Sequence, residues 1–549
     1  MKKHKALIVL LFLLISAFVF SLFKNISFPL LWNDEAETAV FAERILKYGY
    51  PKVHDGKNTL YLLELPRDAG LNHKIDAYVG SGWGQYYFCV IGNLLAKNTS
   101  GIYVKTALLR MPFAFIGLLG LIVIALSVSH FINKNLTHKL LFLIFFVFFE
   151  LFSVSLILHL REVRYYSILI FLSACIFYSY FNYRIARNAS FISYSALIIL
   201  LLILIFNTFS PAFFIFFITI GIYELYLFAK KRDAKEFLVN LLPLFITLIP
   251  MSFLLTFFKT FIISREAAKI FTIDYFPRLL NSLYFFQKYE FLSLLLFVKI
   301  ILISLWFYLR RLKALEINLA SKDRILISNF LSVFFITYLL IINRMPTGYI
   351  FERYYLVLQP ILVIIILLDA FSIFELINFI SSRSIKSFIK ASVFSLMIIV
   401  FMVNVSNKID YVKNHFFELF HQYKGPLDYV IPYIQAKYPN TKNLVIATNY
   451  EEPSYMYYLD SKITFGCMGK DFNRDLAIEP DIIIFRKRFA YTNKIFMEML
   501  NNNRYKKISF PVFDYPVNND PELNFPDYPN LYKTKMCNEA YQCLDIYVR

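Results

Sequence analysis

The chain has 549 residues, of which 58% are hydrophobic, 19% are aromatic and only 17% are charged, whereas soluble globular proteins are roughly 25% charged. This composition excludes an ordinary soluble protein and indicates an integral membrane protein. The formal net charge of +19 would suit nucleic acid, but the positive residues lie in short loops between apolar runs and not on one face of a soluble domain. We therefore expect no nucleic-acid partner.

Apolar runs long enough to span a bilayer recur along the chain, and we expect about eleven transmembrane helices. The runs begin near residues 6, 109, 139, 164, 191, 211, 237, 291, 325, 354 and 390. The first run follows a basic start, but no small-x-small cleavage site follows it, so we expect an uncleaved helix in place of a signal peptide.

The loops between these runs alternate in charge. Six basic segments fall on one side: "MKKHK", "NKNLTHK", "NYRIARN", "AKKRDAK", "RRLKALEINLASKDR" and "SSRSIKSFIK". The positive-inside rule makes that side cytoplasmic, which places the N-terminus inside and the C-terminus outside. We expect a transmembrane catalytic module at 1–407, with a large first extracytoplasmic loop at 24–108, and an extracytoplasmic domain at 408–549.

The tail alternates short β-prone runs with helix-like stretches. The apolar runs are "NLVIATNY", "PDIIIFRKR" and "CLDIYVR". The pattern of "LDYVIPYIQAKY" predicts a helix. This alternation predicts a small α/β domain docked on the outer face of a mainly α polytopic bundle. Cys537 and Cys543 lie close together near the C-terminus, and the sequence leaves open whether they pair or remain free thiols.

The stretch "WNDEAETAVFAERILKYGYP", residues 32–51, follows the first apolar run. Its apolar residues recur at helical spacing, which predicts an amphipathic helix on the outer membrane surface. Asp34 with Glu37 three residues later resembles a capping box, which would explain the acids structurally. The adjacent carboxylates Asp34 and Glu35 would also suit a general base that acts on a substrate whose other half is lipid. The two roles are compatible.

Several expected outer helix ends carry arginine together with tyrosine. These residues are Arg110, Arg161, Arg164, Tyr165, Arg353 and Tyr354. They could be interfacial anchors with snorkelling side chains, but membrane orientation needs positive residues inside and not outside. Guanidinium groups at this depth would bind a lipid phosphate bidentately. Arg161 and Arg164, three residues apart, would face one way at the start of a helix.

Other motifs are missing from the chain. There is no Walker A sequence, and the glycines of "VGSGWGQ" lack G-x-G-x-x-G spacing, so a soluble nucleotide donor is not supported. The histidines show no metal-ligand spacing. Glu150 falls inside the apolar run "FLIFFVFFELFSVSL", where we expect it near mid-bilayer, facing the bundle interior and making a structural hydrogen bond.

Taken in order, these segments resemble the GT-C membrane glycosyltransferases, in the branch of protein O-mannosyltransferases and bacterial lipid A aminoarabinose transferases. The resemblance lies in "WNDEAETAVFAERILKYGYP", "LLRMPFAFIGLLG", "REVRYYSILIFLSA", "ERYYLVLQPILVIIILL" and "ATNYEEPSYMYYLDSKITFG". It implies an enzyme of cell-envelope glycosylation in the bacterial inner membrane. Such an enzyme moves a sugar from a polyprenyl-phosphate carrier to a lipid, glycan or protein acceptor at the extracytoplasmic face, usually with inversion.

The resemblance also implies roles for individual residues. Asp34 would be the base on the acceptor hydroxyl, and Glu35 would orient acceptor or donor. The arginines would neutralise the departing phosphate, because fixed cations stabilise charge that develops in a water-poor site. The candidates for this phosphate-binding role are Arg161, Arg164, Arg353 and Arg110.

The chain departs from the family pattern in the first loop. The aminoarabinose transferases carry a Glu-Lys pair before a proline there, for a metal site and the carrier phosphate, whereas the comparable "VGSGWGQYYF" contains neither acid nor lysine. A divalent metal is compatible with the resemblance but has no support in ligand spacing. The candidate substitutes for the pair are Asp68, Lys74 and Asp76. The expected residues lining the sugar or lipid site, or alternatively packing at the interface, are Trp83, Gln85, Tyr86, Tyr165 and Tyr354.

Two other classes of protein compete with the transferase. A transporter or flippase for a lipid-linked sugar is the main alternative, although it would favour internal repeats and polar residues near the midplane, whereas this chain concentrates charge at the outer rim. A phosphatase would need a histidine or serine nucleophile motif, which is not found. A catalytically inactive scaffold that binds through its tail is the third reading.

Overall fold

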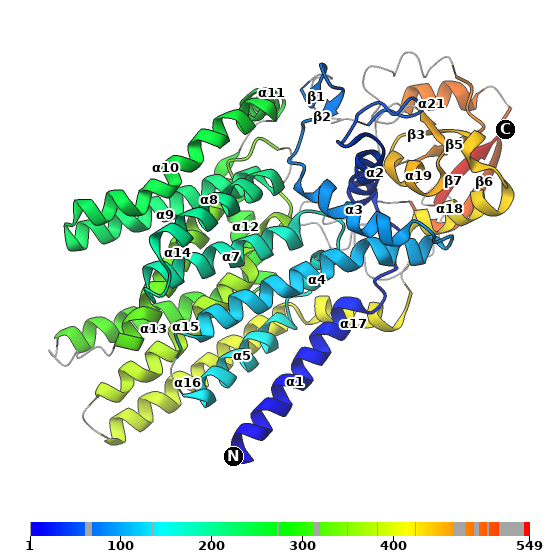
Figure 1. The fold of residues 1–549 in the computed structure, drawn as a ribbon. Coiled ribbons are helices and arrows are strands. Elements are labelled where there is room, and N and C mark those ends of the chain that lie inside the picture. Colours follow the sequence, from blue (N-terminus) through cyan, green and yellow to red (C-terminus); the bar gives the residue numbers. More distant parts are fainter. Residues whose placement is uncertain are drawn as a thin grey trace.

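The computed structural model describes residues 2–60, 69–132, 135–271, 274–311, 319–347, 350–380, 383–422, 424–464, 478–487, 493–501, 504–514 and 543–549. Within these ranges the chain forms a long bundle of helices with a small α/β domain at one end (Figure 1). The N-terminus lies at the far end of the bundle from that domain, and the C-terminus lies within it (Figure 1).

Ten described helices are long and apolar enough to cross a membrane, and a bent helix pair makes up to eleven spans. The ten are α1 (Lys2–Phe23), α4 (Ile102–Ser129), α7 (Tyr166–Arg184), α8 (Phe191–Thr208), α9 (Ser210–Lys231), α10 (Ala234–Phe257), α13 (Leu292–Arg311), α14 (Leu319–Ile342), α15 (Leu358–Leu376, extended by η2, Ile377–Phe379) and α16 (Arg383–Asn407). The prediction of about eleven transmembrane helices in a multi-pass membrane protein is confirmed.

The bent pair differs from a straight span. Helices α5 (Leu136–Glu150) and α6 (Val154–Leu160) meet at 84°. Glu150 faces the interior as predicted, with 1% exposure, but its expected position inside a continuous span is wrong because it is the last residue of α5. Its carboxylate lies near Glu290 and Lys408, and these three residues are called the break cluster. The predicted structural hydrogen bond of Glu150 is wrong, because both of its carboxylate oxygens are buried without a hydrogen-bond partner among the described residues.

The end of the bundle next to the C-terminal domain carries short elements. They are α2 (Asn33–Tyr48), the antiparallel pair β1 (Leu71–Asn72) and β2 (Ala77–Tyr78), α3 (Gly84–Ala96), α11 (Thr260–Ile270), α12 (Tyr275–Tyr289), η1 (Glu352–Tyr355) and α17 (Ile409–Phe420). Helix α2 begins at Asn33 after the N-cap residue Trp32, and no side chain caps it. The predicted capping box is therefore wrong, because Asp34 already lies in the first helical turn and its carboxylate is free to point elsewhere.

The C-terminal domain is built on a five-stranded mixed sheet, in the order β4-β3-β5-β7-β6. Strands β3 (Val445–Thr448), β4 (Lys462–Thr464) and β5 (Ile482–Phe485) are parallel, and β7 (Cys543–Val548) runs antiparallel to β5 and β6 (Lys506–Phe513). Its other elements are α18 (Pro426–Lys437), η3 (Thr441–Asn443), α19 (Glu452–Leu459) and α21 (Asn493–Leu500). The predicted small α/β domain is confirmed, while its boundary at residue 408 stays a prediction. Cys543 is disulfide-bonded, whereas Cys537 lies outside the described residues.

Helix α19 docks this domain onto the chain that enters α2. The hydroxyl of Ser454 donates to the carbonyl of Leu31 at 2.9 Å, and the amide of Leu31 donates to the hydroxyl of Tyr458 at 3.1 Å. The Tyr458 hydroxyl is also 2.5 Å from that of Thr106 on α4. The C-terminal domain therefore fixes the backbone just before α2 against the helical bundle.

Close backbone approaches account for glycines that match no nucleotide motif. A Cβ on Gly82, in "VGSGWGQ", would lie 2.2 Å from the carbonyl oxygen of Asn207 at the end of α8. A Cβ on Gly120 of α4 would lie 2.8 Å from the backbone of Phe171 on α7. Small residues let helices and loops approach this closely, so both glycines serve packing.

Candidate active site

The carboxylate of Asp34 lies between two guanidinium groups from different parts of the chain. Its Oδ2 is 3.5 Å from Nη2 of Arg164, on the segment between α6 and α7, and 3.8 Å from Nη2 of Arg353, on η1. The Asp34 side chain is 23% exposed, whereas those of Arg164 and Arg353 are 15% and 7% exposed. The structure thus brings three of the predicted residues together, and the carboxylate stays accessible.

Glu35 points the other way, into the protein. It is fully buried and pairs with Arg110 of α4, with Nε to Oε1 at 2.8 Å and Nη2 to Oε2 at 2.5 Å. The amide of Val163 also donates to Oε1 at 3.0 Å, and Nη1 of Arg110 donates to two carbonyls of the segment before α2. The pair joins α2, α4 and the segment that carries Arg164, and the guanidinium of Arg110 is occupied by these protein groups.

Arg161 is not brought to Asp34. Its Nη1 donates to the carbonyl of Lys24 at 2.9 Å, and its Nη2 is 3.4 Å from Oε1 of Glu418 on α17. The expectation that Arg161 and Arg164 face one way is wrong, because α6 ends at Leu160 and α7 begins at Tyr166. The intervening turn is not helical, so a spacing of three does not place the two side chains on one face.

Three buried donors around Asp34 have no hydrogen-bond partner among the described residues. They are Nε of Arg164, the hydroxyl of Tyr166 and Nε1 of Trp32. Tyr166 interacts electrostatically with both Arg164 and Arg353, and the guanidinium of Arg353 lies 5.0 Å from the Trp32 ring centroid. Buried donors are almost always satisfied in native proteins. Donors gathered beside two cations fit an anionic group rich in acceptors, such as a phosphate.

Glu37 is a second acid on the helix, three residues after Asp34. Its Oε1 accepts a hydrogen bond from the hydroxyl of Tyr86 at 3.0 Å, and that hydroxyl is 2.7 Å from Oγ of Ser81. Burial raises the pKa of Glu37 to about 7, although nearby Arg164 lowers it, and the negative charge of Asp34 raises it further. Sequence reasoning assigned Glu37 only to a helix cap. The signal that could have found it is its spacing from Asp34, which places both acids on one helical face.

Gln85, Tyr165 and Tyr354 form a wall beside this cluster. The Oε1 of buried Gln85 accepts from the amide of Tyr165 at 3.2 Å. The Tyr165 ring stacks on Phe209 with 4.7 Å between centroids, and Phe209 lies 6.4 Å from Tyr354. Tyr165 directly follows Arg164 in the sequence, and Tyr354 directly follows Arg353. Gln85 contacts Tyr165 through the hydrogen bond given above.

Trp83 packs away from the two arginines. Its Nε1 donates to the carbonyl of Tyr78 at 2.7 Å, and its ring meets Phe257 and Phe258 edge-on at 5.2 and 5.7 Å. Together with the Gly82 contact, this fixes the segment between β2 and α3 against the ends of α8 and α10. Ordinary packing therefore accounts for Trp83.

A metal site is not evident in the part of the chain that the structure describes. No group of three or more His, Cys, Asp or Glu residues there could hold an ion. Of the candidate substitutes for the Glu-Lys pair, Asp68 lies outside the described residues and Lys74 lies in an exposed turn. Asp76 is engaged by His54, with 2.5 Å between Oδ1 and Nδ1.

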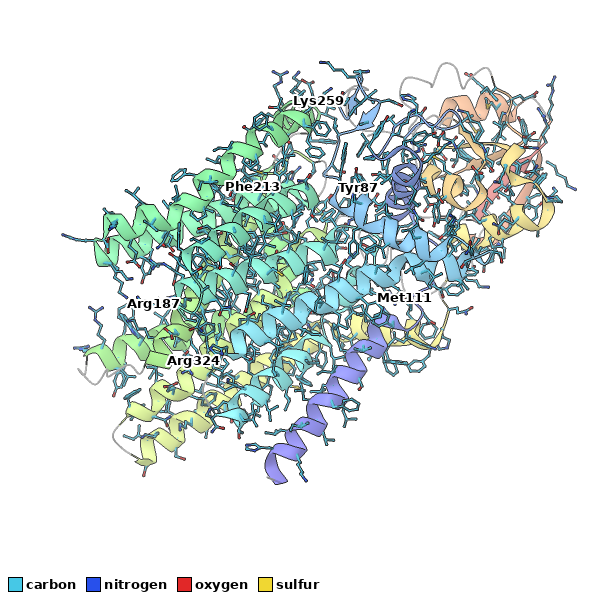
Figure 2. All side chains as sticks on the ribbon, in the orientation of Figure 1. Tyr87, Met111, Arg187, Phe213, Lys259 and Arg324 are labelled. Carbon is cyan, nitrogen blue, oxygen red and sulfur yellow. The ribbon has the colours of Figure 1, made fainter. Side chains whose placement is uncertain are left out.

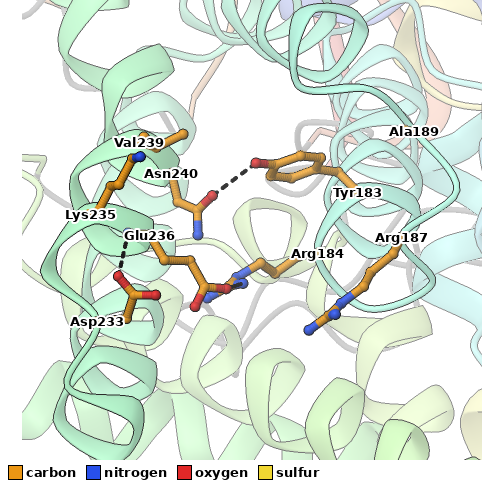
Figure 3. A pocket seen from close by; sticks show the side chains of 9 residues that line it. All are labelled: Tyr183, Arg184, Arg187, Ala189, Asp233, Lys235, Glu236, Val239 and Asn240. Atoms are coloured by element: carbon orange, nitrogen blue, oxygen red, sulfur yellow. Dashed lines mark hydrogen bonds and ion pairs between the residues drawn. The ribbon is translucent and has the colours of Figure 1, made fainter.

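A pocket of about 410 Å³ opens at the opposite end of the bundle (Figure 3). Its lining includes Arg184, the last residue of α7, whereas Arg164 precedes the same helix. Figure 2 labels Arg187 of this pocket at one end of the bundle, and Tyr87 and Lys259 at the other. The lining residues are Tyr183, Arg184, Arg187, Ala189, Asp233, Lys235, Glu236, Val239 and Asn240. None of them is a predicted site residue.

Comparison with family models and with curated proteins finds no match. The fold is similar to that of solved ArnT structures. ArnT from Cupriavidus metallidurans in the apo state aligns over 100% of this chain and 98% of its own, with a TM-score of 0.52 and 11% sequence identity. The same protein bound to undecaprenyl phosphate aligns over 97% of each chain, with a TM-score of 0.50 and 10% identity. The predicted resemblance is confirmed at the level of the fold.

A third structure is the archaeal oligosaccharyltransferase AglB from Archaeoglobus fulgidus, in complex with an inhibitory peptide and a dolichol-phosphate. It aligns over 83% of this chain and 63% of its own, with a TM-score of 0.46 and 10% identity.

Proposed function

We propose that this protein is a membrane glycosyltransferase that moves a sugar from a polyprenyl-phosphate donor to an acceptor at the extracytoplasmic face. The observation that carries the proposal is the partly exposed carboxylate of Asp34, held between Arg164 and Arg353. The GT-C fold supports this class, and a protein with that fold binds undecaprenyl phosphate. In this proposal the N-terminus is cytoplasmic and the C-terminal domain is extracytoplasmic, in accord with the basic inner loops.

The donor phosphate would lie against Arg164 and Arg353. The buried donors of Tyr166 and Trp32 beside them would complete its hydrogen bonds. Fixed cations stabilise the charge that builds on the phosphate as the sugar leaves, without reorganisation at the moment of reaction. Arg110 and Arg161 hold their segments in place instead, since their guanidinium groups bind other protein groups.

The proposed reaction is an in-line displacement. The acceptor oxygen forms a bond to the anomeric carbon while Asp34 takes the hydroxyl proton. The bond from that carbon to the phosphate oxygen breaks on the opposite face, and its electron pair stays on the phosphate. This sequence inverts the anomeric configuration. Glu35 would orient the reactants indirectly, because its pair with Arg110 fixes the start of α2.

Sugar transfer in proteoliposomes tests the proposal, with radiolabelled polyprenyl-phosphate sugars as donors and a membrane extract as acceptor. We expect transfer by the wild type and a fall of roughly 100-fold or more for Asp34→Asn, in the range of general base catalysis. Arg164→Met and Arg353→Met should each cost on the order of 100-fold. Arg187→Met, at the other end of the bundle, is the matched control. Unchanged transfer by Asp34→Asn would show that the base lies elsewhere.

A flippase for a lipid-linked sugar is the second candidate, and one buried cluster favours it. Lys299 of α13 and Asp369 of α15 form an ion pair of 3.0 Å inside the spans, and Ser328 of α14 bonds to both. Transporters place such groups within the membrane. Movement of the donor across wild-type and Asp34→Asn vesicles alike, without transfer in either, would favour this candidate.

A further inference from the structure

Glu37 is a carboxylate at the site that the proposed reaction leaves without a role. Four groups from different elements face it: Asp34 on the same helix, Arg164 before α7, the hydroxyl of Tyr86 on α3, and Tyr78 on β2. Its side chain is partly buried, and Tyr86 donates to it at 3.0 Å. Glu37 therefore lies beside the reacting carboxylate and not on a solvated helical face.

The two acids of this helix have opposite surroundings. The Asp34 carboxylate has two guanidinium groups within 3.8 Å. Glu37 forms no ion pair with any described residue and has a phenol as its hydrogen-bond partner. Where the surroundings of two neighbouring acids differ in this way, the two acids can take different parts in one proton transfer.

We propose that Glu37 is a positioning residue that acts through Asp34 and holds the proton that the acceptor loses. This inference rests on the proposed glycosyl transfer and adds the destination of the proton. As the acceptor oxygen bonds to the anomeric carbon, its proton passes to Asp34. It then moves to the ionised carboxylate of Glu37, so that Asp34 regains its charge between the two arginines. The phosphate leaves with the electron pair, and Glu37 later releases the proton to water, so charge and protons balance.

The pH dependence follows from the state that Glu37 must occupy. It accepts a proton only when ionised, and its pKa of about 7 means that transfer should rise with pH through neutrality. Tyr86 stabilises the ionised form by donating a hydrogen bond. Tyr86→Phe should therefore raise the pKa of Glu37 and move the rise in activity to higher pH.

The test is the pH profile of sugar transfer in the same proteoliposomes, with the same donors and extract. The wild type should show an acid limb with a midpoint near pH 7. Glu37→Gln should lose this limb and transfer about 10-fold more slowly or worse at alkaline pH, because proton transfer contributes at least that much. Glu43→Gln is the matched control, since Glu43 lies on the same helix but pairs with Lys105 at 3.6 Å.

A second measurement does not depend on transfer. Infrared difference spectra of the full-length protein, recorded across the pH range, should show a carboxyl that titrates near neutrality in the wild type and is missing in Glu37→Gln. Its absence from the wild type would overturn the inference. An unchanged pH profile in Glu37→Gln would also overturn it, while the loss of transfer in Asp34→Asn would leave the proposed function standing. If no donor supports transfer by the wild type, the proposed function fails, and the role of Glu37 fails with it.

Discussion

The pair formed by Glu35 and Arg110 should be a main source of rigidity at the head of α2. Both side chains are 0% exposed, and the carboxylate accepts three hydrogen bonds, two from Arg110 and one from the amide of Val163. Glu35→Gln keeps the size of the side chain and one acceptor for Val163, but it leaves a buried guanidinium without its counter-charge. Removing one partner of a buried ion pair costs about 3–5 kcal/mol.

Equilibrium unfolding in detergent micelles measures this loss, and the double variant Glu35→Gln with Arg110→Met isolates the pair. Since the double variant buries no unpaired charge, it should recover most of the stability that either single change loses. Glu43→Gln breaks a partly exposed pair and should cost at most about 1 kcal/mol. Equal unfolding free energies for wild type and Glu35→Gln would refute the reasoning, as would additive losses in the double variant.

Two further changes test the packing described above. Lys408→Met removes the cation of the break cluster and should lower the free energy of unfolding by about 3–5 kcal/mol, again measured by unfolding in micelles. An equal loss in Lys408→Arg would contradict a role for the charge. Gly82→Ala places a Cβ 2.2 Å from the carbonyl of Asn207 and should cost about 1–3 kcal/mol. Gly101→Ala, whose Cβ would lie 3.5 Å from Val104, is its control, and equal effects of the two would refute the steric account.

The number and order of the spans could be predicted from the sequence, because bilayer thickness sets the length of an apolar run. The break after Glu150 could not. The charged groups near Glu150 at the break are Glu290 and Lys408, which lie far away in sequence and come near it only after the bundle has assembled. The hydropathy of the segment that forms α5 and α6 contains no information about contacts with distant residues. It therefore predicts one straight helix in place of the bent pair.

The sequence also predicts only part of the candidate site. The structure brings Asp34, Arg164 and Arg353 together, as their positions next to the ends of apolar runs predict, and their roles stay a prediction. The separation of Arg161 from Arg164 was missed, since the turn between them is fixed by a contact with Glu35, outside its own local sequence. Glu37 was assigned to a cap because its neighbours Tyr86 and Tyr78 come from elements that sequence spacing does not connect to α2.

The contacts of α19 with Leu31 also bear on how the protein matures. Both the amide and the carbonyl of Leu31 find their partners in Tyr458 and Ser454, hundreds of residues later in the chain. The ribosome makes the start of α2 early, but the residues that hold it arrive near the end of synthesis. Assembly of the candidate site therefore waits until the last domain has been made and folded, so that a partly made chain already in the membrane holds an incomplete site.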